Sequence, residues 1–295
     1  MSMLVYRMNF AYIILAYSSL FALSLIDNGR GPAYPEILKT FSIGPSLGSY
    51  IFSLASFSSL AVNLTSKFWL ARFGAVNTTK FSLALMGLSS WGLAYSGQVE
   101  NYPYLLFFSS TLGVSLAILT ITMNILVARG ATLDSRRRLF SGLHAVYGFS
   151  SFVAPAILSA LVAFSFNWKT YFYIVGFIPL IVLFLSFTVH RSKQKVTEVK
   201  SLKTGIKRRT RLLYGILYGS YVSAEITLSS RLPYYLQTAE DYTALKANEA
   251  LSIFFGGLLL GRLLFAVKHF DVKSKTLLYI SLISSCVVFL LGTNV

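Results

Sequence analysis

The chain has 295 residues, of which 55% are hydrophobic and only 12% are charged, and its mean hydropathy is +0.65. It therefore lacks the polar surface that a soluble globular protein of this length needs, and we interpret it as an integral membrane protein. The formal net charge of +16 does not indicate nucleic-acid binding, because the basic residues cluster in short segments between apolar runs.

Nine apolar segments are long enough to cross a bilayer as helices, since a crossing needs about 20 mostly apolar residues. Most of the loops between them are short, so neighbouring helices are expected to run antiparallel and to pack as an all-α bundle. Turn-forming pairs such as Phe73-Gly74 and Asn101-Tyr102 mark the breaks. The predicted spans are residues 9–37, 44–71, 80–98, 103–128, 139–165, 169–189, 212–237, 247–267 and 275–292.

The first span carries charged residues toward its outer end, within SLIDNGRGPAYPEILKT (Ser24–Thr40). A charge that faces lipid at this depth is unfavourable by roughly 2–3 kcal/mol, so Asp27 is expected to face the bundle interior or water. In one interpretation, Asp27 and Asn28 are a proton site or solute ligands in a central cavity. In the other, the segment is the frayed end of the helix, where Asp27 and Arg30 form a solvated pair one turn apart. Glu36 is expected at the membrane interface.

The fourth and fifth spans contribute further polar candidates. Asn124 is either a cavity ligand or the partner in a hydrogen bond between helices. His144, near the cytoplasmic start of the fifth span, is either a packed hydrogen-bonding residue or a proton relay. Most aromatic residues in membrane helices serve packing or anchor the chain at the interface, but we expect Tyr147 and, in the seventh span, Tyr221 to stack on a bound ring.

The longest break, residues 190–211, is strongly basic and separates six spans from three. We expect an N-terminal six-helix lobe over residues 1–189, a cytoplasmic linker over 190–211, and the first three helices of an incomplete second lobe over 212–295. The linker is interpreted as a solvated segment that fixes topology and contacts anionic lipid, with a regulatory or partner-binding site as the alternative.

Basic residues in the loops determine the expected orientation, because they are retained on the cytoplasmic side of the membrane. With the N-terminus inside, the inner segments hold at least eighteen Lys and Arg residues and the outer loops only three, Lys39, Lys169 and Lys246. We therefore expect a multi-pass protein of the plasma membrane, with a cytoplasmic N-terminus and with the C-terminal Val295 outside.

Glu225 is placed near the middle of the seventh span, 14 residues beyond Arg211. No basic residue lies one turn before or after it in the sequence, so a partner would come from another helix. It is either a functional acid in the cavity or a protonated acid in a structural bond between helices. Because removal from water disfavours the charged form of a carboxylate, Glu225 and Asp27 are the expected proton carriers. Arg231 is expected to extend outward to the interface.

Nothing in the sequence indicates an enzyme. It contains no cluster of His, Cys, Asp and Glu at metal-ligand spacing, no Gly-x-Ser-x-Gly and no phosphate-binding loop. The single cysteine, Cys286, excludes a disulfide within one chain. We expect no cofactor, no metal ion and no nucleic-acid partner.

Three stretches carry a family resemblance: SGLHAVYGFSSFVAPAI (Ser141–Ile157), LLYGILYGSYVSAEITLSSRLPYYL (Leu212–Leu236) and GGLLLGRLLFAVKHFDVKSK (Gly256–Lys275). Together with the layout of six helices, a basic loop and further helices, they resemble the major facilitator superfamily, in particular its fucose-type sugar–proton symporter branch. The resemblance implies a major facilitator-type bundle that moves a small organic solute by alternating access. A sugar-like solute and coupling to protons are the finer expectations from this branch.

Two short motifs resemble the family's cytoplasmic gating loops. KFWLARFGAVNTTK (Lys67–Lys80) keeps the Arg and one Gly of the usual loop between the second and third helices, at Arg72 and Gly74. Gly261 and Arg262 match the Gly-Arg pair at the end of the eighth helix. The resemblance implies that these four residues take part in gating.

The chain also departs from the family pattern. Lys67 and Ala71 stand where the gating motif has Gly and Asp, which puts the contact made by that Asp in doubt. In the fourth helix, the fucose-type branch carries an acid about a turn before an Asn, and here Thr120 precedes Asn124 instead. A proton carrier is therefore missing at that position.

Proteins of this family have twelve helices in two lobes, whereas nine spans are predicted here, as if the last three helices were absent. A fragment, a split gene or a degenerate copy would each account for the difference. The expected partners are a small-molecule solute, protons, membrane lipids, and a companion segment or second copy that completes the second lobe. The alternative function is a transport-incompetent membrane protein that acts as a solute sensor or half-assembly.

Overall fold

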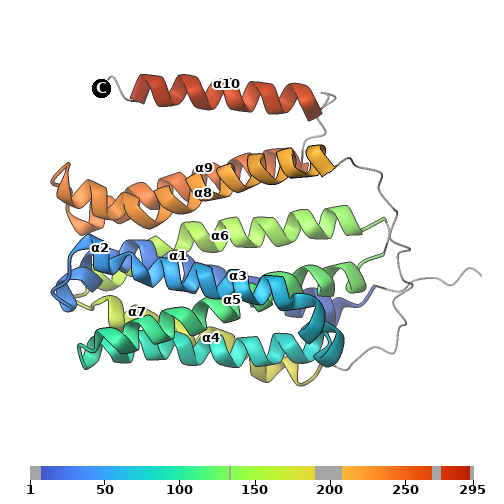
Figure 1. The fold of residues 1–295 in the computed structure, drawn as a ribbon, viewed down its shortest axis with the longest axis horizontal. Coiled ribbons are helices and arrows are strands. Elements are labelled where there is room, and N and C mark those ends of the chain that lie inside the picture. The colour runs from blue at the N-terminus through green and yellow to red at the C-terminus, as the bar shows by residue number, and fades with distance from the viewer. Residues whose placement is uncertain (1–7, 133, 190–207, 268–273, 293–295) are drawn as a thin grey trace, which may run out of the picture.

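The computed structural model describes residues 8–132, 134–189, 208–267 and 274–292, which form long helices lying side by side (Figure 1). The predicted all-α bundle is confirmed. The helices are α1 (Phe10–Thr40), α2 (Pro45–Gly48), α3 (Tyr50–Phe73), α4 (Ala75–Gln98), α5 (Tyr102–Gly130), α6 (Arg136–Ala163), α7 (Trp168–Ser186), α8 (Arg208–Thr238), α9 (Ala244–Val267) and α10 (Ser274–Gly292).

Each predicted span coincides with one helix, except that the second span consists of the short α2 followed by the long α3. Within the described residues, six segments are long and apolar enough to cross a membrane. α4 and α8 are comparably long but richer in Ser, Gly and Tyr. The six segments are Phe10–Thr40, Pro45–Phe73, Tyr102–Gly130, Arg138–Ala163, Trp168–Ser186 and Ala244–Gly261.

Local side chains determine where several helices begin. Asn101 accepts a hydrogen bond from the backbone N–H of Tyr104 at 3.0 Å, and Asn167 accepts bonds from two N–H groups of the first turn of α7. Both asparagines thus satisfy donors that have no partner inside the helix. Gly74 joins α3 to α4 with φ of 73°, which a side chain would strain. α4 therefore starts directly after this turn, five residues earlier than the predicted span.

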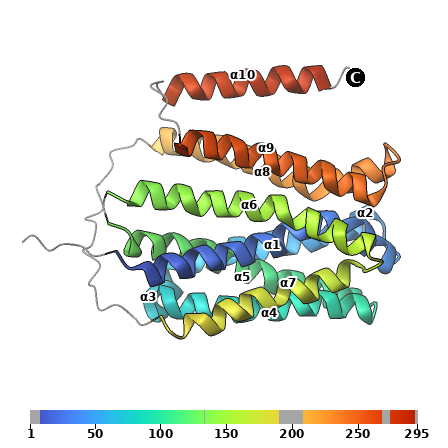
Figure 2. The ribbon, with the colours of Figure 1, turned by 180° about the vertical axis from the view of Figure 1, so that it is seen from behind.

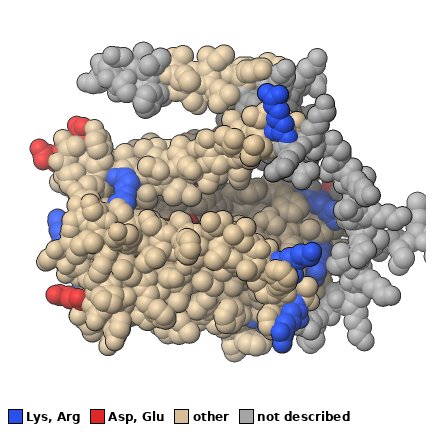
Figure 3. Space-filling view, viewed as in Figure 1, with Lys and Arg blue, Asp and Glu red and all other residues tan. Residues whose placement is uncertain are grey.

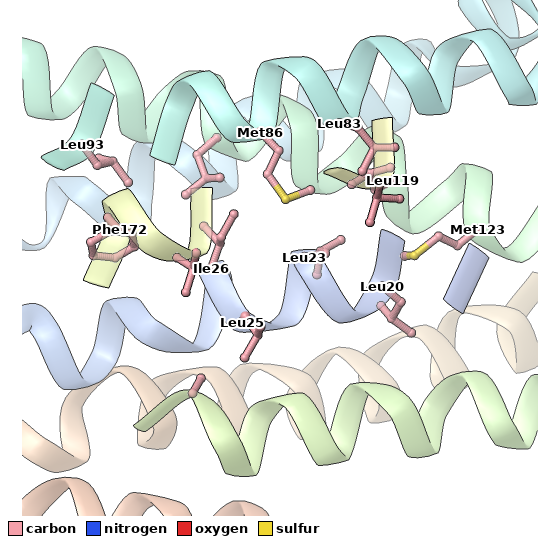
Figure 4. Packing of buried hydrophobic residues seen from close by; sticks show 14 of the residues in the cluster. Leu20, Leu23, Leu25, Ile26, Leu83, Met86, Leu93, Leu119, Met123 and Phe172 are labelled. Carbon is pink, nitrogen blue, oxygen red and sulfur yellow. The ribbon is translucent and has the colours of Figure 1, made fainter. Parts of the chain in front are cut away.

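α1 lies in the middle of the bundle and packs against α5, α6, α7 and α8 (Figures 1 and 2). α4 packs against α5 and α7, α3 against α5, and α9 against α6. Figure 4 shows the apolar contacts in the centre, where Leu20, Leu23 and Ile26 of α1 lie near Leu83 and Met86 of α4, Leu119 and Met123 of α5, and Phe172 of α7.

Small and hydroxyl-bearing residues bring the helices close together. Ser82 of α4 donates a hydrogen bond to the backbone carbonyl of Ser115 in α5 at 2.7 Å, and Ser59 of α3 donates to Gly113 of α5 at the same distance. A side chain at Gly113 would overlap the backbone of Ala55. In the absence of a hydrophobic driving force between helices in lipid, such close contacts and polar bonds hold the bundle together.

α10 lies apart from the other described helices. We expected the last three helices to pack as half of a second lobe. α8 and α9 contact α1 and α6, and α10 has no contact with another helix within the described part of the chain, so its place in such a lobe stays a prediction. Both ribbon views show it apart from α8 and α9 (Figures 1 and 2). All of its residues with described side chains are exposed.

Charged residues separate toward the two ends of the bundle. At the end where α1, α4, α6 and α8 begin, the described basic residues include Arg72, Lys80, Arg129 and Arg136. We call this the basic end and the opposite one the far end. Figure 3 shows most of the visible Lys and Arg at the basic end and most of the visible Asp and Glu at the far end.

Ser252 of α9 provides a test of this packing. Its hydroxyl is buried and has no hydrogen-bond partner among the described residues, whereas the equally buried hydroxyl of Ser82 bonds across to α5. We expect Ser82→Ala to lower the free energy of unfolding in detergent by about 0.5–1 kcal/mol. Ser252→Ala should leave it unchanged or raise it, because no bond is lost and a buried polar group is removed. Equal losses in the two variants would show that Ser252 has a hydrogen-bond partner.

Candidate functional site

A cavity of about 380 Å³ lies among α1, α3, α5, α6, α8 and α9. Four of the residues selected from the sequence line it: Asp27 and Asn28 of α1, Tyr147 of α6 and Glu225 of α8. The seventh span, far away in the sequence, thus contributes its acid to the same space as the polar stretch of the first span. In Figure 3 the surface is hollowed between α8 and the body of the bundle.

Asp27 and Arg30 form the ion pair that one interpretation of the sequence anticipated. The guanidinium Nη2 of Arg30 donates to Asp27 Oδ1, and the two side chains are 11% and 27% exposed. The pair is therefore largely buried and lines the cavity, rather than lying in solvent at a frayed helix end. One nitrogen of the same guanidinium, Nη1, is buried and has no partner among the described residues.

Asn28 links α1 to α6 through a polar cluster. Its Nδ2 lies within 3.0 Å of the Ser24 carbonyl and of Ser151 Oγ, and 3.5 Å from the hydroxyl of Tyr147. Ser24 and Ser151 also bond to each other at 3.1 Å. The cluster orients the Asn28 amide on the cavity wall, where it could bind a hydroxyl or carbonyl group of a solute.

A row of small polar residues on α3 also lines the cavity and was not selected from the sequence. Ser56, Ser59 and Asn63 lie one turn apart on the same helix face. Ser229 and Ser230 contribute from α8. The spacing of three and four residues along α3 was a signal that could have identified this face, but serine is also common at packed helix contacts.

Asn124, His144 and Tyr221 do not line the cavity. All three are exposed, and Asn124 donates to the backbone carbonyl of Thr120 at 2.7 Å. Each lies about one helical turn from a cavity residue, on the side of the basic end: Thr120, Tyr147 and Glu225 are the respective neighbours. Their predicted roles therefore require an approach to the cavity from that end.

The far end of the cavity is closed by contacts between α1, α3 and α8. A side chain at Gly31 of α1 would overlap the backbone of Ser229 in α8, so the two helices touch there. By contrast, every residue of α8 from Leu212 to Tyr221, toward the basic end, is exposed. The cavity is thus sealed toward the far end by the crossing of α1 and α8.

Arg231, which was expected at the interface, contacts two other helices near the far end. Its guanidinium donates to Ser49 Oγ at 3.0 Å and lies over the rings of Tyr34 and Phe52, at 4.4 and 5.2 Å from their centroids. Aromatic faces attract a guanidinium and partly replace its water, so a cation can be held between helices here. Glu36, expected at the interface, accepts a hydrogen bond at 3.1 Å from the backbone N–H of Trp168, the first residue of α7.

The residues of the predicted gating loops lie at the basic end. Gly74 forms the turn between α3 and α4, and the guanidinium of Arg72 lies 5.6 Å from the ring of Phe73. Gly261 lies within α9, with open space where a side chain would be. The side chain of Arg262 is outside the described part of the structure. Within the described residues, no group of three His, Cys, Asp or Glu could hold a metal ion.

A bundle of long apolar helices around a cavity lined by polar residues is typical of a multi-pass membrane protein. The chain belongs to the Major Facilitator Superfamily, whose family model matches residues 16–294. A comparison with curated proteins gave no match. Among solved structures, a D-xylose-proton symporter is similar in fold, with a TM-score of 0.69 and 16% sequence identity. The alignment covers 85% of this chain and 66% of the symporter, so the chain spans about two thirds of the symporter's length.

Proposed function

We propose that this protein is a secondary active transporter that moves a small organic solute across the membrane by alternating access. The observation that carries the proposal is the polar cavity, which holds Asp27, Asn28, Arg30 and Glu225 in the interior of an apolar bundle. Charged groups inside a membrane protein are costly and usually lie on a solute or ion pathway. Membership of the Major Facilitator Superfamily supports the same function.

A sugar-like molecule is the solute class that we propose. The cavity combines hydroxyl and amide groups, such as those of Ser56, Asn28 and Asn63, with the ring of Tyr147. The hydroxyl groups of a sugar can donate hydrogen bonds to the polar side chains and accept hydrogen bonds from them. The apolar face of the sugar ring can pack on an aromatic ring. The fold similarity to a D-xylose-proton symporter supports this class. The fucose-type branch stays a prediction.

We further propose that protons drive the transport, with Glu225 as the main carrier. Glu225 of α8 lines the cavity together with the Asp27–Arg30 pair of α1, so a change in its charge would alter the field in which the solute binds. Protonation of Glu225 would remove a charge from the cavity and favour closure around the solute. Solute uptake would thereby be linked to the proton gradient.

The proposed topology places the basic end in the cytoplasm of a plasma-membrane protein, with the N-terminus inside and the C-terminus outside. The separation of charge between the two ends supports it, since Lys and Arg are retained on the cytoplasmic side. The closed far end then corresponds to a state open to the cytoplasm. Residues 1–189 would form one lobe, 190–211 the linker and 212–295 part of the second lobe.

Transport can be tested with the purified chain reconstituted into liposomes loaded with unlabelled monosaccharides. We expect a radiolabelled pentose or hexose to enter by counterflow, with faster entry when the outside is more acidic than the inside. Liposomes without protein give the background. Counterflow at background level for every monosaccharide tested, in protein that is monodisperse, would contradict the proposal for a sugar-like solute.

A transport-incompetent solute sensor or half-assembly is the second candidate, because α10 has no helix contact within the described residues. In that case a companion segment or second copy would cover α8 and α10, whose described surfaces are largely exposed. Binding of a monosaccharide without counterflow, together with a dimer or a co-purifying chain in light scattering, would favour this candidate. A monodisperse monomer that transports would rule it out.

A further inference from the structure

Two guanidinium groups share one aromatic ring next to the cavity. The guanidinium carbon of Arg30 lies 5.4 Å from the centroid of Phe52, and that of Arg231 lies 5.2 Å from the same centroid. Arg30 belongs to the ion pair with Asp27 on the cavity wall, whereas Arg231 holds the far end closed. Phe52 itself lines the cavity. The ring is therefore in contact with both the binding site and the closure.

The closure depends on a compact aromatic group around Arg231. Tyr34 packs against Phe52 and Tyr234 with ring centroids 5.5 and 5.6 Å apart, and its hydroxyl donates to the carbonyl of Pro45 at 3.0 Å. Arg231 therefore connects α8 to α1 through Tyr34 and to α3 through Phe52. The three helices can separate at the far end only if this guanidinium leaves both rings.

Arg30 is held by the Asp27 carboxylate and by the ring of Phe52. Its hydrogen bonds with described residues all go to Asp27, one residue on the same helix. The buried Nη1 has no described partner. A buried donor without a partner is unfavourable, so a solute acceptor that bonds to Nη1 gains free energy and can draw the guanidinium away from the Phe52 ring. Phe52 would then lose a cation on its face and change its packing.

We propose that Phe52 and Arg231 are positioning residues that couple the Asp27–Arg30 pair in the cavity to closure of the far end. Solute that bonds to this pair moves Arg30, Phe52 follows, and the contact of Arg231 with α1 and α3 weakens. The coupling rests on the proposed function for its physiological meaning. It is a property of the resting structure, however, and can be measured without transport.

Thiol labelling of the cavity from the outside tests the coupling. Cys286 is the one cysteine of the chain, so Cys286→Ala with Ser56→Cys gives a single reporter on the cavity wall. In intact cells, a membrane-impermeant maleimide should label this reporter slowly. We expect Arg231→Gln and Phe52→Leu each to raise the labelling rate at least about threefold, and Arg231→Lys to raise it less.

The decisive comparison is a double-variant cycle. Arg30→Gln should raise labelling when Phe52 is present and have no further effect in the Phe52→Leu background, because the ring carries the coupling. Lys246→Gln, an exposed basic residue of the far end, is the matched control and should change nothing. Labelling of the denatured protein corrects for expression, and size-exclusion profiles identify any misfolded variant.

Two results would overturn the proposal. One is unchanged labelling in well-folded Arg231→Gln, Arg231→Lys and Phe52→Leu, and the other is an effect of Arg30→Gln that is the same with and without Phe52. Failure of the transport assay with the expected labelling pattern would reject the proposed function and keep the coupling. Transport with unaffected labelling would support the proposed function and reject the coupling.

Discussion

Glu225→Gln is expected to abolish proton-driven accumulation of solute while exchange of labelled solute across the membrane continues. Glutamine keeps the shape and the hydrogen-bonding capacity of protonated glutamic acid at the cavity wall. The variant can still change state with solute bound, but it cannot carry a proton. The ratio of inside to outside solute under an imposed pH gradient should therefore fall to about one, as for a transporter without coupling.

The matched control for this experiment is Glu249→Gln. Glu249 is an exposed acid on α9 that does not line the cavity, so its replacement should leave accumulation unchanged. Accumulation by Glu225→Gln with an unchanged pH profile would show that Glu225 is structural. Loss of both exchange and accumulation would place it in solute binding instead.

Gly31→Ala is expected to prevent closure of the far end. A methyl group at this position would overlap the backbone of Ser229, and a carbonyl group in a helix cannot move aside as a flexible side chain can. Overpacking of this kind costs about 1–3 kcal/mol, which would lower the population closed at the far end by roughly 5–150-fold. Initial rates of counterflow should fall by a similar factor.

Gly219→Ala on α8 is the control for Gly31→Ala, since nothing lies within 4 Å of the added methyl group there. It should transport at the rate of the unmodified protein. The Ser56→Cys reporter should in addition label faster from the outside in Gly31→Ala. Normal transport by Gly31→Ala would mean that the contact between α1 and α8 seen here is not part of the transport cycle.

The number of helices, their order and the breaks between them were predictable from the sequence, because each depends on local properties. A run of apolar residues must pair its backbone groups as a helix in lipid, and Gly74, Asn101 and Asn167 end or start helices by their own conformations and side chains. The polar character of the first span and the acid in the seventh were visible for the same reason.

The tertiary structure decided which polar residues meet. Asp27 and Glu225 are nearly 200 residues apart, and the crossing of α1 and α8 is what brings them to one cavity. The serine row on α3 and the contacts of Arg231 were missed because each depends on how one helix is rotated toward another. Hydropathy measures how apolar a segment is, but it does not fix the direction in which the segment's few polar side chains point.

The same distinction applies to Arg231 and to α10. Arg231 was expected to extend outward to the interface, and its contacts with two aromatic rings and with Ser49 could not be read from its own segment. α10 was expected to form half of a second lobe with α8 and α9 because of the family layout, and within the described residues it has no contact with another helix. Apolar composition makes a helix compatible with lipid on every face, so the sequence determined that these helices form, and shape and polar contacts between them decided which ones pack.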